Sequence, residues 1–246
     1  MRSASYLLKL FARWAVLTLS ISTLLFVAAG TMRLPVLRNY LVTFSTFLLA
    51  TMLSIDPGLA IERSRTSEKG GTPGRLVAGL SFLATLTVAA LEVGRLHWVH
   101  SVPADARRTG LLLFAAAMAL QMWAMIVNPF FSPEIRLQPE RGHRLIARGP
   151  YRLLRHPGYL AMLVAVPASA LAIGSWLALL PATAFCLGIL KRVGAEEHFL
   201  QSNLAGYSEY MGRVRGRLFP RMDSRRPCRD SVSSIFASQG SDRRWP

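Results

Sequence analysis

Long apolar runs separated by short polar stretches dominate the pattern along this chain. Four runs have the length that a helix needs to cross a bilayer, and they cover residues 14–30, 39–55, 76–94 and 110–127. A fifth run extends over residues 157–190, which is too long for one helix at ordinary tilt. Gly174-Ser175 near its middle predicts a tight hairpin of two helices, over residues 157–173 and 176–190.

This pattern predicts an all-α, polytopic membrane protein with about five to six transmembrane helices. The composition agrees, because 52% of the 246 residues are apolar and 17% are charged, whereas a soluble domain has about 25% charged residues. The N-terminal run resembles a signal peptide, but further apolar runs follow it. We therefore interpret it as an uncleaved first span.

The polar stretches predict how the chain is divided. Asp56-Pro57-Gly58 predicts a turn after the second run, followed by a polar loop over residues 62–74. Asn128-Pro129 ends the fourth run because proline cannot continue the hydrogen bonds of a helix, and an amphipathic segment follows over residues 130–155. After Glu196 we expect a separate cytoplasmic helix.

We expect three regions in the chain. Residues 1–130 form the N-terminal transmembrane helices, residues 131–220 form the core that holds the functional site, and residues 221–246 form a disordered tail, because the tail has little apolar content.

The net charge of +16 comes from basic residues that gather between the apolar runs. They are most frequent in the N-terminal segment, after the second run and after the fourth run, which alternating spans place on one side of the membrane. Basic loops favour the cytoplasm, so we expect both termini and the loop over residues 149–159 to be cytoplasmic. A nucleic-acid partner is not expected, because no basic stripe with interleaved aromatic residues is present.

The cysteines and histidines predict neither a disulfide nor a metal site. Cys186 lies in an apolar run and Cys228 in the polar tail, so their settings do not favour a bridge. The five histidines lack ligand spacing with cysteine or aspartate.

The loop over residues 149–159 concentrates cationic and aromatic groups directly before an apolar run. Pro157 is favoured as the first residue of a helix, so His156 should lie at the helix mouth. Free backbone N–H groups at that point favour an anion, and Arg155 and His156 would add donors for a carboxylate. The alternative is that Arg152 and Arg155 anchor lipid headgroups and that His156 is an incidental cap.

Glu196 and Glu197 follow the last apolar run. One interpretation is an ordinary ion pair between Arg192 and Glu196, which are four residues apart on a helix. The other is that two adjacent carboxylates at a membrane exit bind a cationic or hydroxyl-rich ligand. A ligand with an ammonium, a sulfonium, a ribose and a carboxylate would match both the glutamates and the Arg/His loop, and S-adenosylmethionine is such a ligand.

The C-terminal part of the chain resembles the isoprenylcysteine carboxyl methyltransferase family, which is itself related to phospholipid N-methyltransferases. The resemblance rests on ordered motifs between residues 128 and 220, whereas the N-terminal half is similar in hydropathy alone. These motifs are Asn128-Pro129, Arg141-Gly142-His143, Gly149-Pro150-Tyr151-Arg152, Arg155-His156-Pro157 with Tyr159, Gly174-Ser175-Trp176, Glu196-Glu197 with Leu200, Gly206-Tyr207 with Tyr210, Arg213-Val214 and Leu218-Phe219-Pro220.

The resemblance implies that the C-terminal helices enclose S-adenosylmethionine as the cofactor. The residues that it assigns to the cofactor are His143, Leu145, Ile146, Tyr151, Arg155, His156, Pro157, Tyr159, Glu196 and Glu197. Of these, the glutamates would hold the amino-acid or ribose end, and the residues before Tyr151 would contact adenine through the backbone. The ring of Tyr159 would face the sulfonium through a cation–π contact.

The resemblance also implies a lipophilic acceptor that enters from the bilayer, with a prenylated cysteine as the default. A carboxylate acceptor is already ionised at neutral pH and needs no general base. An arginine, either Arg213 or Arg192, would orient it.

Other interpretations remain open at this point. Three alternatives to the carboxyl methyltransferase are a phospholipid N-methyltransferase, a sterol-reductase-like enzyme that uses NADPH, and a non-catalytic membrane subunit. Glu92 either lines the pocket or forms an interfacial pair near Arg95, which we favour. The methionines at helical spacing, Met118, Met122 and Met125, are interpreted as packing and not as a substrate track.

Overall fold

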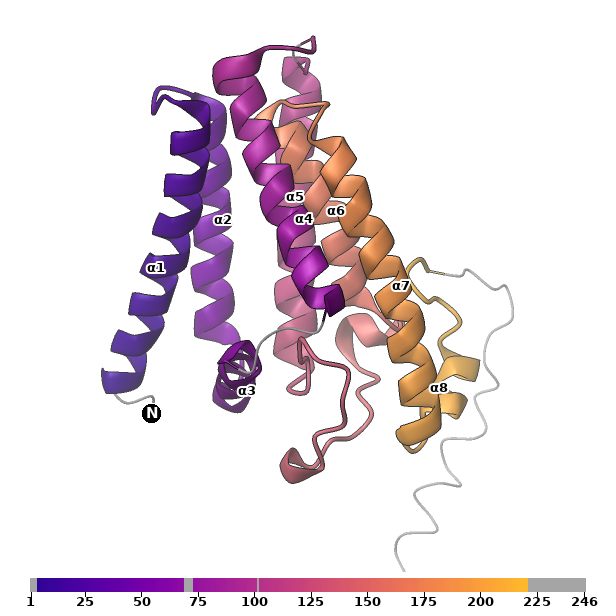
Figure 1. Ribbon diagram of the computed structural model, residues 1–246. Coiled ribbons are helices and arrows are strands. Elements are labelled where there is room, and N and C mark those ends of the chain that lie inside the picture. Colours follow the sequence, from indigo (N-terminus) through magenta and orange to yellow (C-terminus); the bar gives the residue numbers. More distant parts are fainter. Residues whose placement is uncertain (1–3, 69–72, 101, 221–246) are drawn as a thin grey trace, which may run out of the picture.

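The computed structural model describes residues 4–68, 73–100 and 102–220. Six long helices run side by side in a bundle (Figure 1). They are α1 (Ala4–Ala29), α2 (Pro35–Ser54), α4 (Pro73–Leu91), α5 (Ala104–Val127), α6 (Pro157–Ile173) and α7 (Leu179–Asn203). The described residues contain no strand, which confirms the all-α prediction. The predicted disordered tail and Cys228 lie outside the described residues.

In the part of the chain that the structure describes, four helices are long and apolar enough to cross a membrane: α1, α2, the α4 region over residues 74–96, and α5. Large apolar side chains on their outer faces are exposed, among them Val16, Leu80 and Leu112, as expected where lipid is the solvent. The protein is therefore an integral membrane protein. Helix α6 is apolar but has 17 residues, or about 25 Å at the rise of an α-helix, so a full crossing by the α6–α7 hairpin remains a prediction.

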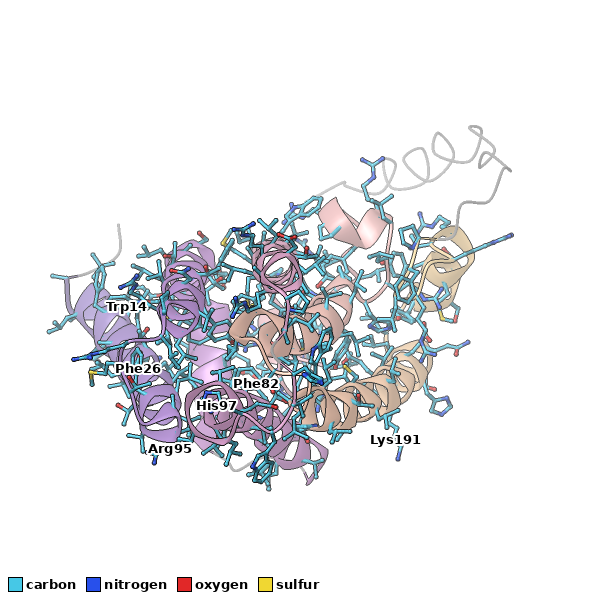
Figure 2. All side chains as sticks on the ribbon, turned by 90° about the horizontal axis from the view of Figure 1, so that it is seen from above. Trp14, Phe26, Phe82, Arg95, His97 and Lys191 are labelled. Atoms are coloured by element: carbon cyan, nitrogen blue, oxygen red, sulfur yellow. The ribbon has the colours of Figure 1, made fainter. Side chains whose placement is uncertain are left out.

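The main core lies where α5 and α6 pack together with α2 and α4. Gly110 of α5 permits close approach, because a Cβ atom there would lie 2.7 Å from the backbone nitrogen of Ala172 on α6. Tyr40 of α2 is fully buried, and its hydroxyl lies 3.2 Å from the hydroxyl of Ser169 on α6. A second cluster joins α6 to α7, and Phe82 of α4 packs against both clusters. Figure 2 shows Phe82 in the middle of the bundle seen from above.

The structure corrects the predicted turn and polar loop after α2. Residues Pro57–Glu68 form helix α3, so the loop predicted over residues 62–74 is wrong for its first part. Pro57 begins the helix, and the Asp56 carboxylate accepts a hydrogen bond from the backbone N–H of Leu59 at 3.1 Å. A carboxylate at this position caps the free N–H groups of a helix start, which explains why Asp56-Pro57-Gly58 starts a helix here.

Helix α7 also differs from the prediction, because it continues without a break to Asn203. The predicted end at residue 190 and the separate helix after Glu196 are both wrong. Glu196 and Glu197 therefore lie on the last turns of α7, and the next helix, α8 (Tyr207–Arg213), follows a turn at Gly206.

The π-helix η1 (Glu92–Leu96) ends α4 and holds the turn between α6 and α7. Glu92 is buried; its carboxylate accepts hydrogen bonds from the Ser175 hydroxyl at 2.7 Å and from the backbone N–H of Val99 at 3.0 Å. The predicted pairing near Arg95 is wrong, because Arg95 donates to the backbone carbonyls of Ala28 and Val27.

The segment between α5 and α6 is irregular, with two short 3₁₀ helices, η2 (Pro139–Arg141) and η3 (Gly149–Arg152), so the amphipathic character predicted for it does not produce a long helix. Arg136 ties it to α3 through an ion pair of 2.7 Å with the buried carboxylate of Glu62. Figure 1 shows this segment, α3 and α8 at the same end of the bundle as the N-terminus. The charge pattern had predicted this grouping; its cytoplasmic orientation remains a prediction.

Candidate functional site

A cavity of about 1220 Å³ opens at this end of the bundle. Its walls come from α4, α5, α6 and α7, from the segment after α5, and from α8. One part is apolar and contains Phe82, Phe114 and Phe185, and another part carries polar side chains. The polar residues include Asn128, His143, Tyr151, His156, Tyr159, Arg192 and Glu196.

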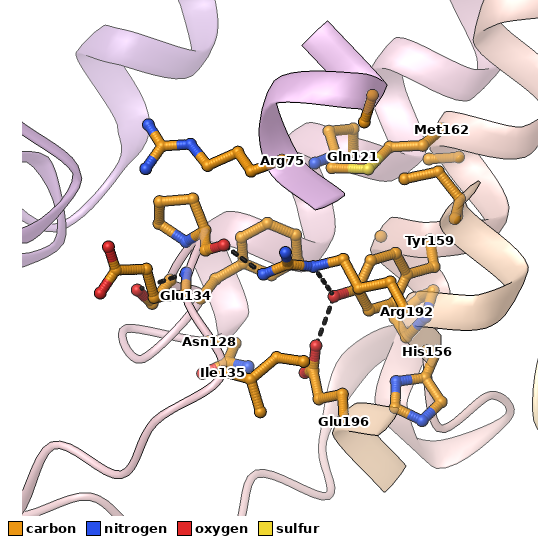
Figure 3. Close-up of a pocket in the computed structure, with 18 of the residues that line it drawn as sticks. Arg75, Gln121, Asn128, Glu134, Ile135, His156, Tyr159, Met162, Arg192 and Glu196 are labelled. Atoms are coloured by element: carbon orange, nitrogen blue, oxygen red, sulfur yellow. Dashed lines mark hydrogen bonds between the residues drawn. The ribbon is translucent and has the colours of Figure 1, made fainter. Parts of the chain in front are cut away.

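The hydroxyl of Tyr159 connects the polar groups of the cavity (Figure 3). It accepts a hydrogen bond from Nε of Arg192 at 2.9 Å and donates one to Oε2 of Glu196. The same arginine donates to the backbone carbonyl of Pro133, across the cavity from α7. The tyrosine hydroxyl therefore bridges Arg192 and Glu196, in place of the direct ion pair considered from the sequence.

Glu197 is held by two arginines from different segments. Its Oε1 lies 2.7 Å from Nε of Arg155, and its Oε2 lies 2.7 Å from Nε of Arg217, while 12% of the side chain is exposed. Arg155 also donates to the carbonyl of Val214 at 2.8 Å. Glu197 is not among the described residues that line the cavity. Its ion pairs with Arg155 and Arg217 instead join the start of α6, the end of α7 and the segment after α8.

Arg155 lies on the cavity wall, as the resemblance implied, and also binds groups of the protein itself. The carboxylate that Arg155 binds belongs to Glu197. The backbone N–H groups of Arg155 and His156 donate to the carbonyls of Gly216 and Arg217, at 2.9 and 3.0 Å. These two N–H groups lie just before the first residue of α6, and an anion at the helix start itself remains a prediction.

His156 lines the cavity and its side chain is 4% exposed. Burial, together with the nearby Arg217 and Arg155, lowers the pKa of His156 from 6.5 to about 3. The imidazole is therefore neutral at physiological pH. Its Nε2 lies 3.8 Å from Oε1 of Glu197 and has no hydrogen-bond partner among the described residues.

His143, Leu145 and Ile146 all lie on the cavity wall, as the resemblance implied. His143 stacks on the ring of Phe130, with a centroid distance of 4.5 Å, and its Nδ1 accepts from the backbone N–H of Gln138 at 3.2 Å. Burial, and next the charge of Arg141, lower the pKa of His143. This part of the wall is therefore fixed in place.

Tyr151 and Pro157 are buried and line the same cavity. The Tyr151 hydroxyl accepts from the side-chain amide of Asn128 at 3.3 Å. Its backbone carbonyl accepts from the hydroxyl of Tyr210 on α8 at 2.6 Å. The motifs at residues 128, 149–152 and 206–210 thus meet in space.

The two arginines expected to orient the acceptor are placed differently. Arg192 lines the cavity, whereas Arg213 is exposed at the end of α8 and is not part of the described wall. Of the methionines, Met118 lines the cavity, and Met125 packs with Ile55 and Leu59.

Sequence reasoning missed two residues of this region. Arg217 was not singled out, because an arginine in a basic C-terminal segment carries no local sign of its partner. Gln121 was also missed, although a lone amide within the apolar run over residues 110–127 was a usable signal.

The fold and the cavity define a polytopic membrane protein whose site combines polar groups at one membrane boundary with apolar walls. Residues 109–202 match the model of the isoprenylcysteine carboxyl methyltransferase (ICMT) family. This match covers most of α5 and all of α6, and it confirms the resemblance to that family, which implies a membrane methyltransferase. No curated protein matches the chain.

Proposed function

We propose that this protein transfers a methyl group from S-adenosylmethionine to the carboxylate of a lipophilic acceptor, with a prenylated cysteine as the default. The observation that carries the proposal is the cavity itself, which joins a polar end to apolar walls formed by membrane helices. A polar cofactor and an apolar acceptor can approach each other in such a space. The family match over residues 109–202 supports this assignment.

The polar end of the cavity fits S-adenosylmethionine in its chemistry. Glu196 offers a carboxylate for the ammonium or ribose, and the neutral His156 offers a buried nitrogen that has no partner within the described ranges. A buried polar atom without a partner costs about 1–3 kcal/mol, and a ligand can remove that cost. His143, Leu145 and Ile146 would contact the adenine on the facing wall.

The bound cofactor supplies an electrophilic methyl group on a sulfonium, and the chain supplies position and exclusion of water. Of the two arginines expected to orient the acceptor carboxylate, we assign Arg192, because it lines the cavity and is fixed by Tyr159 and Pro133. An ionised carboxylate attacks without a general base, so orientation is the main contribution that the side chains make.

The apolar tail of the acceptor would lie along α4 and α7, where Ala78, Gly79 and Phe82 of α4 and Ala184 and Gly188 of α7 line the cavity. We propose that the chain is oriented with this site in the cytoplasm. Basic residues at this end of the bundle support that orientation.

A transfer assay with labelled S-adenosylmethionine tests the proposal. Purified protein in lipid nanodiscs should label an N-acyl, S-farnesylated cysteine with a free carboxylate and should not label its methyl ester. Labelling of neither compound, at acceptor concentrations that saturate the membrane, would contradict the acceptor assignment.

Amine methylation of a phospholipid is the second candidate. That reaction requires a group that takes a proton from the amine, and Glu196 places a carboxylate in the cavity wall. Lipid extract in the same assay separates the two functions, since the label then appears in phospholipid.

A further inference from the structure

Gln121 is the one amide in the otherwise apolar stretch of residues 110–127 on α5. Its Oε1 is buried and has no hydrogen-bond partner among the described residues, and its Nε2 contacts only the sulfur of Met125, at 4.0 Å. A polar side chain within a membrane helix is costly and commonly serves a function. Because Gln121 lines the cavity, a bound molecule can satisfy it.

The surroundings of Gln121 differ from those of the polar end. Figure 3 shows Gln121 beside Met162, with Arg192 and Tyr159 between them and Glu196. The amide lies against Gly158 on the first turn of α6, where a Cβ atom would be 3.5 Å from Oε1. Gln121 therefore lies beside the first turn of α6, where the polar end of the cavity meets its apolar walls.

We infer that Gln121 is a specificity-determining residue, whose side-chain carbonyl accepts a hydrogen bond from an N–H or O–H group of the acceptor. The inference rests on the proposed function, because that function assigns the apolar part of the cavity to the acceptor. A short rotation of the terminal amide, whose torsion is soft, turns Oε1 toward the cavity. In a prenylated cysteine the donor is the amide N–H next to the carboxylate.

A polar site built for a donor discriminates against an analogue that lacks the donor, because the buried group is then left unpaired. We expect the protein to prefer an acceptor with an N–H group by about tenfold, which corresponds to one unpaired buried hydrogen bond. The matching pair of probes is N-acetyl-S-farnesylcysteine and S-farnesylthiopropionate, which share the carboxylate and the tail and differ in the amide.

Gln121→Met is the test variant, since methionine keeps the unbranched shape without the amide. Gln138→Met is the matched control. Gln138 is fully buried, donates to the carbonyl of Phe130 at 3.0 Å and accepts from Arg141, so its amide is used within the protein. Without ligands, Gln121→Met should leave the thermal midpoint unchanged or raise it, and Gln138→Met should lower it.

The binding of both probes is then measured in nanodiscs, together with the binding of S-adenosylhomocysteine. The inference predicts that Gln121→Met abolishes the preference for the amide probe and leaves S-adenosylhomocysteine binding intact. The inference would be overturned if the unaltered protein bound the two probes equally or bound neither. It would also be overturned if Gln121→Met had a lower thermal midpoint or lost the binding of S-adenosylhomocysteine. Failure of the proposed function is distinguishable, since the unaltered protein would then bind no S-adenosylhomocysteine or transfer no label.

Discussion

Nε of Arg155 lies 2.7 Å from Oε1 of Glu197, although 42 residues separate them in the sequence. This pair brings the start of α6 to the end of α7, and Arg217 closes the group from the C-terminal side. The convergence of the two ends of the last helical pair was the central expectation from the sequence. The contacts show that Glu197 maintains this arrangement, while Glu196 faces the cavity.

Removal of the Glu197 charge should destabilise the protein more than removal of Arg217. In Glu197→Gln two arginines lose their ionic partner, and the Arg155 side chain is 10% exposed, so we expect a loss of about 3 kcal/mol. Arg217→Ala leaves the Arg155 pair intact, and Arg217 is 42% exposed, so its loss should be about 1 kcal/mol or less. Thermal unfolding in detergent measures both, and equal midpoints for the two variants would contradict the assigned role.

Tyr159→Phe should reduce methyl transfer and leave the fold intact. The variant removes the hydroxyl between Arg192 and Glu196, and a misplaced positioning group reduces the rate by about tenfold to 100-fold. Tyr40→Phe is the control, because it removes a tyrosine hydroxyl that bonds Ser169 in the core. That variant should lower the thermal midpoint and keep the rate constant of transfer. The role of Tyr159 would be disproved by a rate equal to that of the unaltered protein.

His156 should contribute to the pH dependence of the free energy of unfolding. Its pKa is about 3 in the folded protein and 6.5 when unperturbed, so the unfolded chain binds the proton more readily between these values. The contribution of His156 to the free energy of unfolding is thus fully present above pH 6.5 and decreases as the pH falls. At pH 5.5 the loss is about 1.4 kcal/mol. Unfolding measured between pH 5 and 8 should show a shallower acid slope for His156→Gln. Identical slopes would show that His156 is not buried in its neutral form.

Gly158→Ala should disturb the cavity wall, because its Cβ atom would lie 2.6 Å from Cζ of the Phe131 ring. Gly188→Ala is the matched control, since a Cβ atom there meets no atom within 4 Å. Alanine within a helix is more favourable than glycine by about 0.5–1 kcal/mol, so Gly188→Ala should raise the thermal midpoint while Gly158→Ala lowers it. Combining Gly158→Ala with Phe131→Leu should recover part of the loss, and no recovery would refute the steric explanation.

The sequence predicted elements where apolar length and helix-breaking residues agree. Helix α6 was predicted with its correct ends because Pro157 starts it and Gly174 ends it in a left-handed conformation. The end of α7 was predicted too early, since the loss of hydropathy after Leu190 marks the end of the apolar stretch and not of the helix. Helix α3 was missed because it is polar on average, and because Asp56-Pro57-Gly58, which starts the helix, was interpreted as a turn.

The residues of the candidate site were predicted better than the contacts between them. The residues that the resemblance assigned to the cofactor between His143 and Tyr159 do line one cavity. The sequence could not show which glutamate pairs with which arginine, because Glu196 and Glu197 are adjacent and their side chains diverge on the helix. Arg217 acts through a partner that is distant in sequence and forms no part of a local pattern. Gln121 was recognisable as a lone amide in an apolar run, but the sequence does not show that its Oε1 is buried.

Titration calorimetry of S-adenosylmethionine onto the purified protein in nanodiscs tests the central claim most directly. The account predicts saturable binding at one site, weakened about tenfold or more by Glu196→Gln, which removes a charge from the cavity wall. Glu140→Gln, which alters an exposed carboxylate paired with Arg136 on the segment after α5, should bind as the unaltered protein does. Absence of saturable binding, or an equal loss in both variants, would contradict the account.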